Sequence, residues 1–470
     1  MFRRRGTLAC NDIKGHEKTN MGANRYISRR RFLRRTRDLG LLAVGFPYIV
    51  SASALGANGA TPPSEKIVMG CVGVGSMGGG HLRVFNSFDD VEVVAACDLR
   101  KIFRTRAEER VGCKTYTDFR ELMAREDIDA VCIATPDFWH ALVAIEAAKN
   151  GKDMYMEKPV DVHVAAAKAL REAVNRYGVV FQFGTQQRSG RDFRLACELV
   201  RNKRIGKLQT IVVGSLSSME FPNQPTQPTP DVKEFNYDMW LGPAPWAPYT
   251  YERCASRAMG TDGLWTHMYD YSLGGLSGAW GIHHVDIAQW GNDTDHTGPV
   301  EVEGTGTFPK DGLSDTAIAW HVEHKYENGV TMVHTNSKNA AKIYPEFHSD
   351  KLQYKGCGIL FMGTEGWVIV SRRGIDAHPK SLLKETIGPD EIRLPVSNNH
   401  RRNFIECVKT RSQPICSIET AVRSDTICHL DDIAMRLGRK LRWNPDKEEF
   451  INDERANQML TRPLRSPWHL

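Results

Sequence analysis

The feature that most constrains the fold is a glycine triplet, Gly73, Gly75 and Gly78, which follows an apolar run over residues 67–72. A segment with helical spacing comes next, and a second apolar run ends in Asp98. Glycine permits a tight turn out of a strand, a close backbone approach to a ligand, and close packing of the next helix on the strand. The first N–H groups of such a helix lack partners within it and can bind an anion. The pattern therefore predicts a strand, a tight turn and a helix whose N-terminus faces a phosphate group.

Asp98 makes this reading more specific. It lies 20 residues after Gly78, at the end of the second predicted strand, where a carboxylate can accept hydrogen bonds from the ribose of an adenine dinucleotide. Its negative charge favours NAD over NADP, because it repels the 2′-phosphate that NADP carries. Arg100 and Lys101 follow closely and could compensate that charge. We therefore expect NAD as the cofactor, with NADP as the alternative.

The positive charge of the chain is concentrated at its beginning. The 470 residues carry a formal net charge of +6, and residues 1–54 hold 12 Lys or Arg against 3 Asp or Glu. This surplus of nine leaves the rest of the chain with a net charge of −3. A surface for nucleic acid needs basic residues clustered in the folded part, so we expect no nucleic-acid partner. The content of 41% hydrophobic and 25% charged residues predicts a globular chain, long enough for two domains.

The basic head has the order of a twin-arginine export signal. Residues 28–33 read Ser-Arg-Arg-Arg-Phe-Leu, an uncharged apolar run follows over 39–50, and small residues lie at 52–54. The apolar run is shorter than the roughly 20 residues that span a bilayer, but it fits the apolar part of a cleaved signal. We expect export to the periplasm through the twin-arginine machinery, with cleavage after Ala54 or a few residues later. The alternatives are an uncleaved signal that anchors the protein in the membrane, and a basic tail without a targeting role.

The 11 cysteines are scattered, and ten of them follow the signal. None forms a CxxC pair or a Cys/His cluster with metal-ligand spacing, so we expect no metal site. We expect mostly buried free thiols, which suits a chain that folds in the cytoplasm before export. A structural disulfide is the alternative in an oxidising compartment.

Strand-like and helix-like segments alternate from residue 66 to about 184, which predicts an α/β domain with a parallel, doubly wound sheet. Beyond residue 290 strand-length runs follow one another with glycine or polar breaks, which predicts a large, mostly antiparallel open sheet in an α+β domain. The long loop over 221–270 is rich in Pro, Trp and Tyr and could form a lid or a binding wall. The expected parts are an N-terminal extension with the signal (1–60), a Rossmann domain (64–185), a second domain (186–445) and a C-terminal tail (446–470).

Three further motifs carry groups suited to chemistry. Residues 135–140, Thr-Pro-Asp-Phe-Trp-His, follow one predicted strand, and Glu157-Lys158-Pro159 follows another. Both motifs thus lie at the carboxyl ends of parallel strands, where open α/β sheets bind ligands. The third motif, Gly-Ile-His-His-Val-Asp over 281–286, opens an amphipathic stretch. Oxidation of a CH–OH group by a nicotinamide needs a cation near the oxygen and a base, which these motifs can supply.

Together the motifs resemble those of the glucose-fructose oxidoreductase/inositol dehydrogenase/MocA (Gfo/Idh/MocA) family. The resemblance covers roughly residues 65–440, and Glu157-Lys158-Pro159 is its most specific element. The run His-His-x-Asp-Ile-Ala-Gln-Trp and the segment 240–254 are similar to an exported bacterial branch. The resemblance implies an NAD(P)-dependent oxidoreductase that transfers a hydride between a sugar or polyol CH–OH and a tightly held nicotinamide cofactor. It also implies a second domain that binds substrate and forms a homo-oligomer through its open sheet.

The resemblance also implies residue roles. Lys158 would polarise the substrate hydroxyl, His283 would act as base, and Glu157 would orient the lysine. Successive helix residues point in different directions, so only one of His283 and His284 can face the cofactor, and that choice stays open. The implied cofactor contacts are Gly73, Gly75, Ser76, Met77, Gly78, Asp98, Arg100, Thr135, Pro136, His140, Glu157 and Lys158. The substrate contacts, assigned by position in the family, are Gln186, Arg188, Trp246, Tyr251 and His284.

One position departs from the family pattern. Many members carry an aspartate four residues before the histidine, where this chain has Ala279. Asp286, Asp270 or a water molecule could replace it, or His283 could act alone. Two other functions therefore stay open. One is a glycoside hydrolase that oxidises sugar C3 transiently and eliminates the glycosidic bond, as in the related α-N-acetylgalactosaminidase branch, and the other is a non-catalytic sugar-binding protein.

Overall fold

The computed structural model describes residues 62, 65–260, 263–278 and 280–470. The twin-arginine motif, the apolar run, the expected cleavage region and Ala279 lie outside these residues. The export signal and the effect of Ala279 therefore stay predictions.

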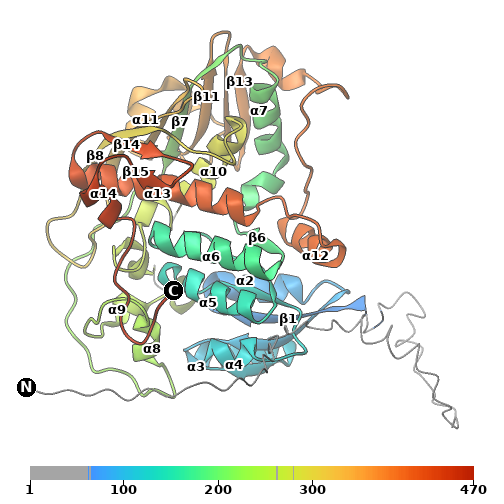
Figure 1. Ribbon diagram of the computed structural model, residues 1–470, viewed down its shortest axis with the longest axis vertical. Helices are drawn as coiled ribbons and strands as arrows, with labels where there is room; N and C mark the ends of the chain where they lie inside the picture. Colours follow the sequence, from blue (N-terminus) through green and yellow to red (C-terminus); the bar gives the residue numbers. More distant parts are fainter. Residues whose placement is uncertain (1–61, 63–64, 261–262, 279) are drawn as a thin grey trace, which may run out of the picture. The chain divides into compact units, whose positions relative to one another are not determined.

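The first sheet has six parallel strands in the order β3-β2-β1-β4-β5-β6 (Figure 1). The chain leaves β1 toward β2 and later returns to its other side with β4, and ligands bind beyond the strands at such a reversal. The predicted doubly wound parallel sheet is thus confirmed. Its strands are β1 (Ile67–Val72), β2 (Val91–Cys97), β3 (Lys114–Tyr116), β4 (Ala130–Ile133), β5 (Asp153–Met156) and β6 (Phe181–Phe183). Its helices are α2 (Ser76–Phe85), α3 (Lys101–Val111), α4 (Phe119–Met123), α5 (His140–Lys149) and α6 (Val164–Tyr177).

The second sheet has nine strands in the order β13-β12-β11-β7-β10-β9-β8-β14-β15. All neighbours pair antiparallel except β7 and β10, which pair in parallel. The large, mostly antiparallel sheet is therefore confirmed. Its strands are β7 (Leu208–Ser215), β8 (Glu301–Thr307), β9 (Ala319–Lys325), β10 (Thr331–Asn336), β11 (Gly358–Gly363), β12 (Trp367–Ser371), β13 (Gly374–His378), β14 (Leu441–Asn444) and β15 (Glu449–Phe450).

Helices of the second half surround this sheet and also reach the first domain. Helix α13 packs against β8, against α10 and against α6 of the first domain, and Figure 1 shows it running beside α6. Helix α12 places Phe404 and Ile405 in the apolar cluster formed by β1, β2 and α2. The Rossmann core is thus completed by a helix from far along the chain. The helices are α7 (Arg191–Arg201), α8 (Tyr237–Leu241), α9 (Tyr251–Cys254), α10 (Gly281–Gly291), α11 (Ser337–Ile343), α12 (His400–Thr410), α13 (Ile418–Leu437) and α14 (Glu454–Gln458).

The cysteines of the described ranges are buried free thiols, ten in number. In the same part of the chain no group of three or more His, Cys, Asp or Glu side chains is arranged to hold a metal ion. No helix in the described ranges has the length and apolar character that crossing a bilayer requires.

Candidate active site

A cavity of about 700 Å³ lies at the carboxyl ends of the first sheet's strands and extends to β12 and α10 of the second domain. Ligand pockets typically measure about 300–1,000 Å³. The cavity brings together most of the residues that the sequence nominated. Those that line it are Gly73, Gly75, Ser76, Met77, Asp98, Arg100, Thr135, Pro136, His140, Glu157, Lys158, Gln186 and His283.

The glycine loop between β1 and α2 forms one end of the cavity. Gly73 has φ +76°, and a β-carbon on it would lie 2.5 Å from the carbonyl oxygen of Ala134. A β-carbon on Gly78 would lie 1.7 Å from the carbonyl oxygen of Gly73, so Gly78 serves helix packing and does not line the cavity. Gly75 caps α2 without any side-chain hydrogen bond to the helix. The N-terminus of α2 is therefore free to bind an anion.

Asp98 holds this loop. Its two carboxylate oxygens accept hydrogen bonds from the N–H groups of Val74 and Arg100, each at 2.9 Å. Burial raises the pKa of Asp98, against the backbone N–H groups that lower it. The Arg100 side chain donates to the carbonyl oxygen of Cys254 at 2.9 Å, and Lys101 pairs with Glu234 at 2.7 Å. The two cations considered as compensation for a 2′-phosphate are thus engaged elsewhere, which favours NAD.

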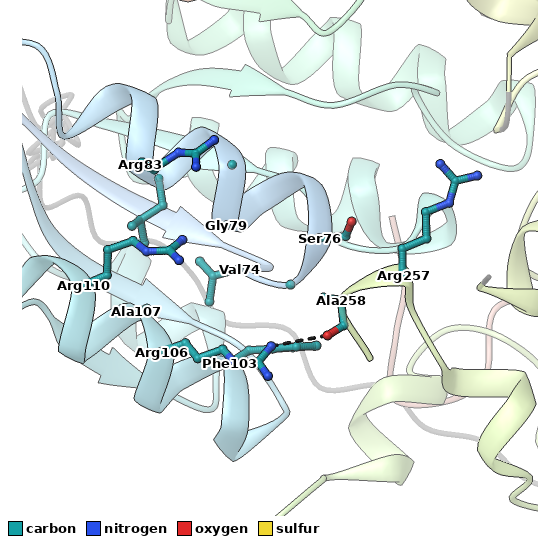
Figure 2. A pocket seen from close by; sticks show the side chains of 13 residues that line it. Val74, Ser76, Gly79, Arg83, Phe103, Arg106, Ala107, Arg110, Arg257 and Ala258 are labelled. Atoms are coloured by element: carbon teal, nitrogen blue, oxygen red, sulfur yellow. Dashed lines mark hydrogen bonds between the residues drawn. The ribbon is translucent and has the colours of Figure 1, made fainter. Parts of the chain in front are cut away.

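A smaller pocket of about 360 Å³ lies beside the same loop (Figure 2). Arg83 of α2 and Arg106 and Arg110 of α3 line it, and Arg106 donates to the carbonyl oxygen of Ala258 at 3.4 Å. Positive charge around a concave surface attracts anions, so these arginines favour the approach of phosphate groups to the loop. Four residues line both this pocket and the larger cavity: Gly75, Ser76, Phe103 and Arg257.

A chain of hydrogen bonds positions the Glu-Lys-Pro turn. Arg401 of α12 donates from Nε to His81 Nδ1 at 2.7 Å, and His81 Nε2 lies 2.8 Å from Glu157 Oε1. Because Nδ1 accepts, His81 carries its proton on Nε2 and donates it to Glu157. Burial raises the pKa of Glu157, but this hydrogen bond and the charge of Lys158 outweigh burial and lower the pKa to about 2. Glu157 is thus an ionised anchor, and its other oxygen accepts from the Lys158 N–H at 3.3 Å.

His283, and not His284, lines the cavity with Lys158. The Lys158 ammonium donates to the carbonyl oxygen of Gly278 at 2.5 Å. His283 Nδ1 is buried without a hydrogen-bond partner, and burial, with the charges of Arg372 and Lys158, lowers the pKa of His283 well below its usual range. His284 has both nitrogens engaged, with the Gly214 carbonyl oxygen at 2.9 Å and the Trp280 indole at 3.2 Å.

His140 and Thr135 hold the adjoining strand end. The His140 ring lies between two carbonyl oxygens, that of Pro159 at 2.6 Å and that of Thr135 at 2.9 Å. Burial lowers the pKa of His140, and the ring links the two loops that follow β4 and β5. The Thr135 hydroxyl is buried and has no hydrogen-bond partner. It is a group that a bound ligand could satisfy.

Asp137 is a cavity residue that the sequence analysis did not nominate. Its carboxylate accepts a hydrogen bond from the Ser272 hydroxyl at 2.7 Å. Burial raises the pKa of Asp137 to about 7, although the Lys158 charge acts in the opposite direction. A carboxyl group with a pKa near neutrality can accept or release a proton. Its place in the 135–140 motif was a clue, but its hydrogen-bond partner Ser272 is remote in sequence.

The predicted substrate contacts fare differently. Gln186 lines the cavity, but Arg188 is 2% exposed and binds Asp286 and Asp295 through two hydrogen bonds each, at 2.7–2.9 Å. Asp286 is thereby paired with Arg188 and does not line the cavity. Trp246 is 70% exposed, and neither it nor Tyr251 or His284 lines the cavity. The aromatic and basic side chains that do so from the second half, besides His283, are Phe235, Trp240, Arg257, Trp265, His267, Trp280, Tyr354 and Arg372.

These features fit a dinucleotide. Gly73 and Gly78 have no room for side chains, the N-terminus of α2 is uncapped, Asp98 follows the end of β2, and a buried hydroxyl lacks a partner. The fold and the cavity therefore define a two-domain, nicotinamide-dependent oxidoreductase. Matches to known sequence families support this class. Residues 67–185 match "Oxidoreductase family, NAD-binding Rossmann fold", and residues 220–357 and 387–470 match "Oxidoreductase family, C-terminal alpha/beta domain". The chain belongs to the Gfo/Idh/MocA oxidoreductase family.

Two curated proteins from Shewanella are similar to part of this chain. The glycosyl hydrolase family 109 protein 1 of Shewanella sp. (strain ANA-3) is 31% identical, and the α-N-acetylgalactosaminidase of Shewanella oneidensis is 30% identical, each over 157 residues. Each alignment covers 31% of this chain and 34% of the relative, so the match spans about a third of these curated relatives.

Solved structures share the fold. The WlbA dehydrogenase from Chromobacterium violaceum, in complex with NADH and UDP-GlcNAcA, has a TM-score of 0.59 at 17% identity, over 86% of this chain and 99% of that one. The myo-inositol 2-dehydrogenase from Lactobacillus plantarum has a TM-score of 0.52 at 17% identity, over 80% and 99%. At this identity the likeness shows the fold alone.

Proposed function

We propose that this protein oxidises a CH–OH group of a sugar or polyol with NAD. The observation that carries the proposal is that Lys158 and His283, from different domains, line one cavity with the glycine loop. Bound NAD would supply the hydride acceptor. The residues of the chain would bind the substrate, exclude water and move its hydroxyl proton.

Each group has a defined task in this reaction. The Lys158 ammonium has three N–H groups, of which one is used by Gly278, so the others can polarise a substrate oxygen. His283 has its imidazole in the uncharged form that can accept the proton. Asp137, with a pKa of about 7, is a second acceptor on the same cavity. The hydrogen-bond chain from Arg401 keeps the Glu-Lys-Pro turn in place.

The test is the Lys158→Ala variant with Lys149→Ala, an exposed lysine of α5, as control. A panel of sugars and polyols is followed by nicotinamide absorbance, and NAD binding by calorimetry. We expect Lys158→Ala to lower kcat about 10²- to 10⁴-fold with an NAD Kd within a few-fold, and Lys149→Ala to behave as wild type. Turnover that survives Lys158→Ala would refute this role. If the protein only binds sugars, neither the wild type nor either variant will reduce NAD with any sugar or polyol of the panel.

A second candidate is a glycosidase that uses NAD transiently, and the similarity to family 109 hydrolases favours it. Oxidation at C3 would acidify the neighbouring C–H, the glycosidic bond would break by elimination, and water addition and reduction would complete the cycle. Release of p-nitrophenol from p-nitrophenyl α-N-acetylgalactosaminide, without an added acceptor and without net formation of NADH, would identify this activity. Accumulation of a keto-sugar would identify the dehydrogenase.

We also propose that the protein is exported by the twin-arginine route, retains its cofactor and assembles with copies of itself. The motif at 28–33 and the large open sheet support these points. Replacing Arg29 and Arg30 by lysine should keep the protein in the cytoplasm in cell fractionation. Dialysis of purified protein should leave nicotinamide absorbance behind, and light scattering should give a mass above that of one chain. A cytoplasmic wild type, complete loss of cofactor or a monomeric mass would contradict the respective point.

A further inference from the structure

Arg372 is a cation of the cavity that has no part in the proposed reaction. It lies in the turn between β12 and β13 and lines the cavity with Lys158 and His283. Its guanidinium carbon lies 4.2 Å from the centroid of the Trp280 ring, within the range of a cation–π contact. With the Gln187 amide oriented to satisfy both of its atoms, its oxygen accepts from Arg372 Nε at 3.2 Å. The guanidinium is therefore held by one stacking contact and one hydrogen bond.

The same amide connects Arg372 to the reacting end of the cavity. In that orientation the Gln187 nitrogen donates to the carbonyl oxygen of His283 at 2.7 Å. Arg372 is also the charge that most lowers the pKa of His283, ahead of Lys158. The guanidinium and the ammonium of Lys158 therefore act on the same small space around the His283 ring.

The two terminal nitrogens of Arg372 have no hydrogen bond or ion pair with any residue of the described ranges. The carboxylates of the cavity are engaged elsewhere, Asp98 with backbone N–H groups, Glu157 with His81 and Asp137 with Ser272. Partial burial lowers the pKa of Arg372, yet a guanidinium stays charged in proteins. Arg372 is an exposed side chain at the rim of this cavity and Lys158 is half-buried, and neither forms an ion pair with a carboxylate of the described ranges, so this end of the cavity presents two positive charges that attract an anionic ligand.

We infer that the substrate is a sugar acid, whose carboxylate binds the free fork of Arg372 while its CH–OH group reaches Lys158 and His283. This inference rests on the proposed function. The planar guanidinium matches a carboxylate with two parallel hydrogen bonds, which fixes both position and orientation. A neutral polyol would leave the fork unpaired. A sugar phosphate shares the anionic chemistry, so the experiment separates the two.

The experiment measures binding to the full chain loaded with NAD, by tryptophan fluorescence, for D-glucose, D-glucuronate and D-glucose 6-phosphate, and for D-galactose and D-galacturonate. We expect the uronates to bind at least about 10-fold more tightly than the neutral sugars. Arg372→Gln should remove most of that preference, whereas Arg372→Lys should keep part of it. Arg373→Gln is the matched control, because Arg373 is an exposed neighbour in the same turn that does not line the cavity.

Several results would overturn the inference. They are equal binding of acids and neutral sugars, no binding of either uronate at about 10 mM, a preference for the phosphate over the uronate, or equal losses in Arg372→Gln and Arg373→Gln. A loss of NAD affinity in Arg372→Gln that matches its loss of uronate affinity would assign the residue to the cofactor instead. Because the readout is sugar affinity and not NADH formation, a uronate preference that depends on Arg372 can hold even where the oxidation of the bound sugar fails.

Discussion

Two alanine substitutions in α2 test the glycine loop most directly. A β-carbon at position 78 would lie 1.7 Å from the Gly73 carbonyl oxygen, whereas one at position 80 would have no neighbour within 4 Å. Since real β-carbons stay at least 3.0 Å from such atoms, Gly78→Ala must separate α2 from the β1 turn by about 1.3 Å. Gly80→Ala requires no movement.

The two variants should therefore change the free energy of unfolding in opposite directions. Forcing an atom into a packed contact costs about 1–3 kcal/mol, and a shift of about 1 Å at a binding site can cost on the order of 100-fold. We expect Gly78→Ala to lower the free energy of unfolding by that amount and to weaken NAD binding about 10- to 100-fold, or about 1.4–2.8 kcal/mol. Gly80→Ala should stabilise the helix by about 0.5–1 kcal/mol without changing NAD affinity.

Calorimetric titration with NAD gives the affinities, and denaturant unfolding gives the stabilities. Equal NAD affinity in Gly78→Ala and wild type would refute the reasoning, because the loop would then not form the binding surface. A loss of affinity in Gly80→Ala as large as that in Gly78→Ala would refute it too, since the effect would come from the helix in general and not from the turn.

Two more predictions concern buried charges. The pKa of Asp137 is raised from 3.8 to about 7. The contribution of this group to the free energy of unfolding is therefore fully present below pH 3.8 and is lost as the pH rises through 7. Over this window the free energy of unfolding should fall by roughly 3–5 kcal/mol because of this group. In Asp137→Asn, urea unfolding at pH 4 and pH 8 should show that this fall has disappeared, and an unchanged fall would contradict it. Arg188→Leu leaves Asp286 and Asp295 without their buried partner and should destabilise the protein by about 3–5 kcal/mol. The matched surface change Arg191→Leu should cost much less, and equal losses would count against a buried network.

The first sheet could be predicted from sequence because its signals are local. Apolar strands, the glycine turn and Asp98 follow each other within about thirty residues, and the structure has β1, α2 and β2 in those places. The short strand β3 and the parallel pairing of β7 with β10 were not predicted. Both depend on which strand lies beside them, and the residues of β7 and β10 are separated by a long excursion of the chain.

The site was predictable only where chain neighbours determine it. The Glu-Lys-Pro turn and the glycine loop are strand-end motifs, and they lie in one cavity. Arg188 was misread as a substrate contact because sequence shows a basic residue after a strand but not the remote carboxylates of Asp286 and Asp295 that bury it. Asp137 and Arg372 were missed because their contacts in the cavity come from remote segments. Ser272 donates a hydrogen bond to Asp137, and the Trp280 ring stacks on Arg372.

Helix α12 links the Rossmann core to the rest of the chain in a way that bears on protein engineering. Its Phe404 and Ile405 pack into the core of the first domain, and its Arg401 donates a hydrogen bond to His81, which in turn contacts Glu157. A chimaera joined at residue 185, with the first domain taken from another family member, would inherit a foreign fit along this helix. Exchanging the first domain between relatives therefore requires moving residues 400–410 together with it.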